Sequence, residues 1–232
     1  MRASFKHLFV AIAFFAGALQ AQPEIPLNEY GLNVVSDNSI YHELVSLDSN
    51  NAILDLELII PNLKKDVKYA TTDNVTKHVL YETPGVFLRS PAAYALKRVA
   101  EELALNGIGL VIYDGYRPYA VTKKIWEFVL DDNFAASPKT GSRHNRGCAI
   151  DLGLYDIKTG DLLEMPTVFD EFTPKAGHSY HDLSLEIRAN RALLRSVMEK
   201  HGFVVYDSEW WHYDYKDWKK FDLMDIPFEK LR

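Results

Sequence analysis

Apolar residues recur with helical spacing in three stretches of the chain, which predicts helices over residues 91–106, 118–129 and 185–200. The first helix is preceded by Ser90 as a typical N-cap and opens with Pro91 at its first position. The first and third stretches are each followed by a glycine, which favours the end of a helix. The pattern therefore predicts well-delimited helices separated by other elements.

Short apolar runs bounded by turn residues predict strands between these helices. These β-like stretches cover residues 52–60, 108–113, 147–155 and 203–206. A Lys-Thr-Gly turn at residues 158–160 predicts that the third of them forms a hairpin with residues 161–165. Hairpins are frequent and parallel crossovers are few. We therefore predict an α+β fold, with a small, mainly antiparallel sheet flanked by helices.

The strand that starts at Gly147 alternates between two kinds of side chain. One face carries Cys148 and three branched apolar residues, which is typical of a buried core face. The other face carries small and polar residues, including Asp151, and is expected to be open enough for a ligand to approach. The alternation therefore predicts that Asp151 points into a site and that Cys148 does not.

Residues 1–21 differ in composition from the rest of the chain. Arg2 and Lys6 precede an apolar run over residues 8–19, and small residues follow, a pattern typical of a secretory signal peptide. The run is too short to span a bilayer comfortably, which argues against the alternative, an uncleaved membrane anchor. We therefore expect an exported protein, periplasmic or secreted, with no stable membrane insertion after cleavage and a single domain over residues 22–232.

The mature chain is acidic. Removing residues 1–21 takes away two positive charges and no acids, so the formal net charge of −6 becomes −8. An acidic chain without a basic block gives no reason to expect a nucleic-acid partner. Cys148 is the single cysteine of the sequence, so no internal disulfide can form and the core must stabilise the fold.

His144 and Asp151 lie close together in "SRHNRGCAIDLGL" at residues 142–154, but a catalytic zinc site needs at least three protein ligands. Two sources for a third ligand lie downstream. One is the pair His178 and His181 in a loop, and the other is His212 in the aromatic run "EWWHYDY". Bulky neighbours on a strand position a ligand better than a loop does, which favours His212. A histidine among aromatic residues is, however, more often a packed core residue.

Glu209 lies three residues before His212 and supplies a candidate general base. In a straight strand the two side chains would face opposite ways. The turn residues Asp207 and Ser208 suggest that Glu209 still lies in a bend, from which it can reach the face of His212.

Four motifs in this order, "DGYRP", "SRHNRGCAIDLGL", "MPTVFDEF" and "EWWHYDY", resemble the zinc D-alanyl-D-alanine dipeptidases. These belong to a wider group of D-Ala-D-Ala metallopeptidases that share a fold with the hedgehog signalling domain. The resemblance covers residues 88–215, whereas residues 22–80 match no pattern. Cys148 stands where the family pattern has an apolar residue, and it substitutes there as a small hydrophobe.

The resemblance implies a role for each residue that matches the family pattern. His144, Asp151 and His212 would bind one zinc ion per chain, Glu209 would be the general base, and Arg117 would stabilise the transition state. Asp170 would bind the free ammonium of the substrate. Ser142 would also contact the substrate. Asp170 could equally be a cap before Glu171 on local sequence alone.

The resemblance implies hydrolysis of the free dipeptide D-Ala-D-Ala to two D-alanines, and the D configuration comes from the resemblance alone. One alternative is a D,D-carboxypeptidase or endopeptidase that acts on larger peptidoglycan peptides. In those relatives the last motif has a proline where this chain has Trp210, which favours the dipeptidase. A second alternative is a non-catalytic, hedgehog-like zinc-binding module. Such a module could lose Glu209 or Arg117 without losing the metal, and both are present.

Overall fold

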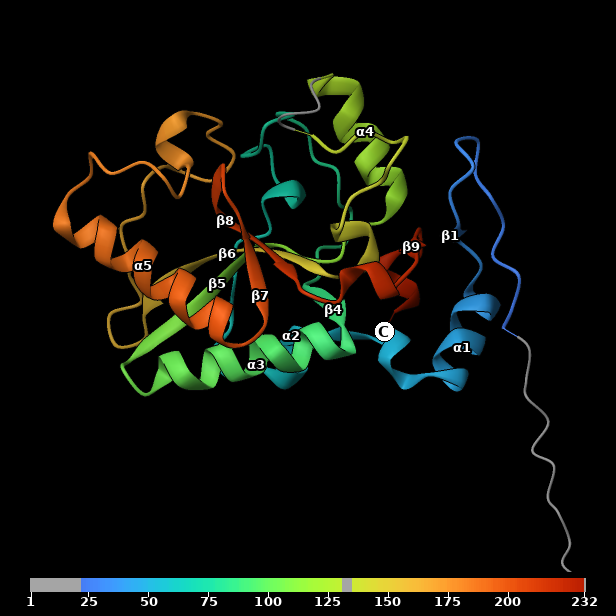
Figure 1. Ribbon diagram of the computed structural model, residues 1–232, viewed down its shortest axis with the longest axis horizontal. Helices are drawn as coiled ribbons and strands as arrows, with labels where there is room; N and C mark the ends of the chain where they lie inside the picture. Colours follow the sequence, from blue (N-terminus) through green and yellow to red (C-terminus); the bar gives the residue numbers. More distant parts are fainter. Residues whose placement is uncertain (1–21, 131–134, 232) are drawn as a thin grey trace, which may run out of the picture.

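A computed structural model describes residues 22–130 and 135–231 (Figure 1). The predicted signal peptide, residues 1–21, lies outside this described part. The fold is α+β, as predicted, with helices packed on a mixed but mainly antiparallel sheet. Within the described residues, no helix combines the length and apolar character needed to cross a membrane.

The main sheet crosses the middle of the molecule (Figure 1). Its edge pair β3–β5 is parallel, and the pairs β5–β6, β6–β8 and β8–β7 are antiparallel. The central strands β5, β6 and β8 carry Asp114, Asp151, Glu209, His212 and Asp214, which are discussed below. In spatial order, the described strands of this sheet are β3 (Lys64–Lys65), β5 (Ile108–Asp114), β6 (Ala149–Asp156), β8 (Glu209–Tyr215) and β7 (Phe203–Tyr206).

The two longest helices of the described chain, α3 (Ser90–Ala104) and α5 (Leu185–Lys200), contact each other and the sheet. Helix α4 (Tyr119–Val129) lies at the opposite side of the sheet from α3 (Figure 1). Smaller elements complete the fold: the helices α1 (Asn38–Leu47) and α2 (Leu56–Ile59), the parallel pair β1 (Val34–Val35) and β9 (Leu223–Met224), and the antiparallel pair β2 (Ile53–Asp55) and β4 (Phe87–Arg89).

Strand β6 confirms one half of the predicted alternation and corrects the other. Cys148 and the apolar residues of its face are buried in the core, as predicted. The opposite face is not open, because Tyr155 is also buried and Tyr113 covers Gly153. A Cβ atom at Gly153 would lie 2.6 Å from the Tyr113 hydroxyl, so close packing requires glycine there. The second face is therefore a packed surface that is open only near Asp151.

Three predicted elements differ from the structure. Residues 52–60 are not one strand, because β2 ends at Asp55, whose carboxylate accepts a hydrogen bond from the Glu57 amide and caps α2. Helix α3 starts at Ser90, so Arg89 and not Ser90 occupies the N-cap position. The hairpin turn after β6 forms, but its return segment is reduced to one bridge, between Tyr155 and Leu162.

Candidate active site

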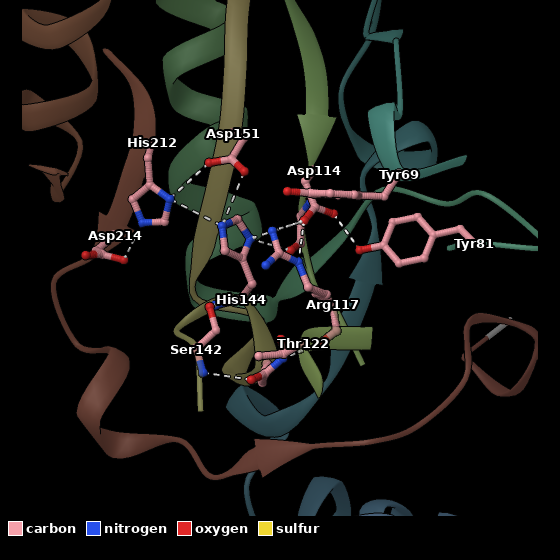
Figure 2. A network of polar contacts seen from close by, with 12 residues as sticks. Tyr69, Tyr81, Asp114, Arg117, Thr122, Ser142, His144, Asp151, His212 and Asp214 are labelled. Carbon is pink, nitrogen blue, oxygen red and sulfur yellow. Dashed lines mark hydrogen bonds and ion pairs between the residues drawn. The ribbon is translucent and has the colours of Figure 1, made fainter. Parts of the chain in front are cut away.

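A group of three side chains lies at the junction of β6 and β8 (Figure 2). His144, Asp151 and His212 are all buried, and one potential ligand atom from each lies within 4.8 Å of the others. Asp151 and His212 are directly opposite each other in the antiparallel β6–β8 pair, which brings their side chains to the same face. The structure therefore brings together the three residues that the sequence singled out for a metal.

His144 reaches this group from a 3-10 turn, His144–Arg146, that precedes β6. The turn ends at Gly147 with φ +65°, and a Cβ atom there would lie 2.7 Å from Ile53 Cδ1. Glycine is required at this position both for its conformation and for space. The turn is also held against residue 117, because the Arg117 amide donates to the His144 carbonyl (3.1 Å).

Each imidazole has one nitrogen engaged outside the group, which orients the other nitrogen inward. His144 Nδ1 lies 2.8 Å from the Gly115 carbonyl, and its Nε2 lies 3.4 Å from Asp151. His212 Nε2 lies 3.0 Å from Asp214 Oδ1, and its Nδ1 lies 3.0 Å from Asp151 Oδ1. Partners of this kind fix the tautomer and the ring plane of histidines that bind metals.

The group is electrostatically suited to a cation. Burial alone would raise the pKa of Asp151, but His144 and His212 outweigh it and hold the pKa below its usual range. Burial likewise opposes protonation of His212, yet hydrogen bonds to Asp151 and Asp214 raise its pKa well above the ordinary value. Two imidazoles and a carboxylate are also a donor set that zinc accepts in catalytic sites. The residues present therefore fit a divalent metal.

Glu209 is the first residue of β8, and its Oε2 lies 3.9 Å from His212 Nδ1. The β7–β8 pairing explains how both side chains reach one face. Val205 pairs with Tyr213, but Tyr206 pairs with Glu209, so the register is irregular between them. The predicted bend is therefore an irregularity in a strand pair. Burial raises the pKa of Glu209 to about 7, which suits a group that exchanges protons near neutral pH.

Arg117 is buried, and its guanidinium is fixed by Asp114 (Figure 2). Arg117 Nη2 and Nε lie 2.7 and 2.8 Å from Asp114 Oδ2. The other oxygen, Oδ1, accepts hydrogen bonds from the Tyr81 hydroxyl (2.8 Å) and the Gly115 amide (3.0 Å). Asp114 was not among the residues predicted from the sequence, although its place three residues before Arg117 in "DGYRP" was an available signal.

Asp170 and Ser142 line the same cavity as the three-residue group. Asp170 has φ +60° and accepts hydrogen bonds at Oδ2 from the Val75 amide (3.0 Å) and the Tyr69 hydroxyl (3.3 Å). Burial raises its pKa to about 7. These contacts are long-range, so Asp170 is not a local cap before Glu171. The Ser142 hydroxyl accepts from the His144 amide (3.2 Å) and so supports the turn that carries His144.

The cavity has a volume of about 500 Å³, and its wall includes all seven residues that the sequence analysis proposed for the site. Arg143 stands at the same wall, where it pairs with Asp214 (3.3 Å) and lies over the ring of Trp218. The rival histidines His178 and His181 line a different cavity and do not join the three-residue group.

Comparison with known proteins identifies relatives of this chain. The family model described as D-Ala-D-Ala dipeptidase matches residues 49–228. The chain is 35% identical over 183 residues to the D-alanyl-D-alanine dipeptidase of Escherichia coli (strain K12), which covers 78% of this chain and 94% of that protein. It is 32% identical over 185 residues to the D-alanyl-D-alanine dipeptidase of Enterococcus faecium, with 70% and 90% covered.

A solved structure of the LdcB LD-carboxypeptidase is also similar, with a TM-score of 0.43 and 19% identity over 85% of this chain and 86% of that chain. The match of the family model to most of the chain, together with the identity to the curated enzymes, decides the classification. The chain belongs to the D-Ala-D-Ala dipeptidase family of metallopeptidases.

Proposed function

We propose that this protein hydrolyses the free dipeptide D-Ala-D-Ala to two molecules of D-alanine. The observation that carries the proposal is the position of Glu209 beside the group of His144, Asp151 and His212, in a cavity that Arg117 also lines. Curated relatives that carry the name D-alanyl-D-alanine dipeptidase, at 32–35% identity, support the same activity.

We propose zinc as the metal, with one ion per chain held by His144, Asp151 and His212. When bound, the ion would polarise the peptide carbonyl and make a water molecule more acidic. The two imidazoles are already oriented by Gly115 and Asp214, so little reorganisation is needed to present their free nitrogens.

Glu209 takes the proton of the attacking water and delivers it to the leaving amine. A carboxylate with a pKa of about 7 can do both, because neither its acid nor its base form is strongly disfavoured at neutral pH. Arg117 stabilises the negative charge that develops on the carbonyl oxygen. Because Asp114 fixes its guanidinium before substrate binds, this stabilisation needs no rearrangement during the reaction.

Asp170 pairs with the free ammonium of the substrate. Both of its hydrogen bonds in the described structure are made by Oδ2, which leaves Oδ1 for the ligand. A buried carboxylate whose pKa is raised by desolvation is stabilised by a cation, and a substrate ammonium supplies one. Ser142 borders the same space and is proposed to contact the substrate as well.

Two other functions would use the site differently. A D,D-carboxypeptidase or endopeptidase would need room for a peptide chain where the dipeptide has its ammonium, and Asp170 occupies that position in our proposal. A non-catalytic zinc module would not need Glu209 and Arg117, both of which line the cavity. The dipeptidase reaction therefore gives a role to more of the residues that line the cavity than either alternative does.

The decisive experiment compares D-Ala-D-Ala with its N-acetyl derivative, using the purified protein loaded with zinc. The blocked substrate leaves the buried Asp170 without a cation to pair with its charge, so we expect kcat/KM to fall by about a hundredfold or more. Asp170→Ala should reduce this preference. Equal cleavage of both substrates would refute the dipeptidase proposal and favour the carboxypeptidase.

A second comparison separates chemistry from metal binding. Glu209→Gln should retain zinc and lower kcat by about three orders of magnitude, since the base is lost and the donor set remains. His212→Ala should lose zinc and activity together. Full zinc occupancy in both His144→Ala and His212→Ala would show that the donor set is wrong.

The cellular location is also proposed. Residues 1–21 have the composition of a secretory signal peptide, so the mature protein is expected in the periplasm or outside the cell. N-terminal sequencing of the protein recovered from the periplasmic or culture fraction would test this, and recovery of an uncleaved chain from the cytoplasm would refute it.

A further inference from the structure

The substrate proposed above ends in a carboxylate that has no cationic partner among the residues assigned so far. A free dipeptide carries an ammonium at one end and a carboxylate at the other, and Asp170 is assigned to the ammonium. Three carboxylates line the active-site cavity, those of Asp151, Asp170 and Glu209. Like charges repel in a confined site, so a substrate carboxylate needs a cation beside it.

The cavity wall offers three arginines for this purpose: Arg117, Arg143 and Arg146. The first is held by Asp114 on two of its nitrogens. The third donates to the Phe221 carbonyl. The Arg143 guanidinium donates no hydrogen bond within the part of the chain that the structure describes, and its contact with a carboxylate there is the ion pair with Asp214. Arg143 is therefore the arginine of this wall that retains donors for a ligand.

Arg143 is held in place and yet remains accessible. It is the N-cap residue of the 3-10 turn that carries His144, so its backbone is fixed beside a proposed metal ligand. Its guanidinium carbon lies 5.1 Å from the ring centroid of Trp218 and 5.9 Å from that of Tyr206, and both rings line the cavity. The side chain is 39% exposed, so a solute in the cavity can reach it. A charged group fixed in this way loses little entropy when it binds.

The ion pair with Asp214 orients the free edge of the guanidinium. The contact is made by Nε of Arg143, 3.3 Å from Asp214 Oδ2, which leaves the Nη groups for a ligand. Asp214 is buried and is not among the residues that line the cavity, so it holds Arg143 from behind. The other oxygen of Asp214 contacts His212 Nε2 at 3.0 Å.

Arg143 and Asp170 flank the three-residue group on different sides. His212 turns Nε2 away from the group toward Asp214, the partner of Arg143. Asp170 instead accepts a hydrogen bond from Tyr69. Figure 2 shows Asp214 beyond His212 at one end of the polar network and Tyr69 at the other end. A dipeptide has its two charges on the two sides of its one peptide bond, so these anchors suit a peptide bond placed at the metal.

We propose that Arg143 binds the C-terminal carboxylate of the dipeptide through its two Nη groups. The planar guanidinium matches a carboxylate in both geometry and charge, and two parallel hydrogen bonds also fix its orientation. With Asp170 on the ammonium, the site then binds both ends of the substrate, and a substrate blocked at its C-terminus is cleaved poorly. This inference rests on the proposed dipeptidase activity and adds a specificity-determining residue to it.

The C-terminal amide of D-Ala-D-Ala tests the proposal, because it has the size of the dipeptide without the negative charge. Isothermal titration of the zinc-loaded Glu209→Gln protein measures binding without turnover. D-Ala-D-Ala should bind about tenfold or more tightly than the amide. Adding Arg143→Met should weaken D-Ala-D-Ala by about 10–100-fold, the usual effect of losing charged hydrogen bonds, and should leave the affinity for the amide nearly unchanged.

Steady-state kinetics with Glu209 intact separate recognition from damage to the metal site. Loss of Arg143 also removes a partner of Asp214, and a disturbed His212 would slow both substrates alike. The measured quantity is therefore the ratio of kcat/KM for D-Ala-D-Ala to kcat/KM for the amide. This ratio should fall from about tenfold or more to near one in Arg143→Met, and only in part in Arg143→Lys, which keeps the charge but not the planar fork.

Arg146→Gln is the matched control, because it removes one positive charge from the same wall and should leave this ratio unchanged. An unchanged ratio in Arg143→Met, or equal affinity of the Glu209→Gln protein for D-Ala-D-Ala and its amide, would overturn the assignment of Arg143. The dipeptidase proposal would survive either result as long as the native protein cleaves D-Ala-D-Ala. If the native protein did not cleave it, the proposed function would fail, and the titration alone would decide on Arg143.

Discussion

Replacing Asp114 with asparagine tests whether Arg117 is held in place before substrate binds. The change keeps the shape of the side chain and removes its charge. Asp114 is 1% exposed and receives two hydrogen bonds on each oxygen, from Arg117 on one side and from Tyr81 and Gly115 on the other. An asparagine has one oxygen, so its NH₂ group must face donors on one of the two sides.

The expected loss follows from burial of the pair. Removing one partner of a buried ion pair costs about 3–5 kcal/mol, because the other charge stays buried without compensation. In a domain of this size 1 kcal/mol lowers Tm by about 2–4 °C, so Asp114→Asn should lower Tm by roughly 6–20 °C. A displaced Arg117 should also lower kcat by about 10²–10³, the usual effect of losing one preorganised donor to an oxyanion.

Differential scanning calorimetry and steady-state kinetics on the zinc-loaded protein measure the two effects. Tyr81→Phe is the matched control, because it removes one hydrogen bond to Asp114 and leaves both contacts to Arg117. It should cost about 0.5–1.5 kcal/mol and leave kcat nearly unchanged. A Tm of Asp114→Asn within 2 °C of the native protein would show that the buried pair does not stabilise the fold as argued. An equal loss of kcat in both variants would show that the role of Arg117 in catalysis does not depend on its fixation by Asp114.

Two further predictions concern other polar groups of the site. Asp214→Asn should weaken zinc binding by about 10–100-fold, because His212 loses the carboxylate that fixes its ring. Competition with a chelator measures the zinc affinity, and an unchanged affinity would contradict this prediction. In the metal-free protein, burial raises the pKa of Asp170 from 3.8 to about 7, so folding favours the protonated carboxyl. The contribution of Asp170 to the free energy of unfolding therefore falls as pH rises from about 4 to 7. The stability advantage of Asp170→Asn over the native protein should therefore grow across this range in urea unfolding, and a constant difference would show that Asp170 does not titrate there.

Much of the site follows from local pattern combined with family resemblance. The alternation in β6 is enough to separate Asp151 from Cys148, because side chains of one strand point to opposite faces. The alternation does not show that β6 pairs with β8, so the meeting of Asp151 with His212 rested on the resemblance and not on spacing. For Glu209, the turn residues Asp207 and Ser208 indicated a bend, but the irregular β7–β8 register that orients its side chain is a pairing between strands that local sequence does not specify.

Other features were missed because they depend on tertiary contacts. Asp114 ends an apolar strand, where an aspartate usually begins a turn, and its burial becomes clear only when Tyr81 and Arg117 are placed around it. The stretch at residues 52–60 was assigned as a strand by its apolar character alone. Its second half is helical because Asp55 caps it and Leu56 is buried against the core.

Residues 22–80, in which the sequence showed no motif of the family although the family model matches from residue 49, supply part of the site. The Tyr69 hydroxyl lies 3.3 Å from Asp170 Oδ2. The Arg117 guanidinium lies over the Tyr69 ring, with Cζ 4.8 Å from the ring centroid. The Val75 amide donates to the same oxygen of Asp170 (Figure 2 shows the neighbouring Tyr69). These contacts set the position of the two charged groups proposed to bind the ammonium and to stabilise the oxyanion. Since their spacing must match a dipeptide, we expect this segment to contribute to the choice of substrate length, although it carries none of the residues proposed to perform the chemistry.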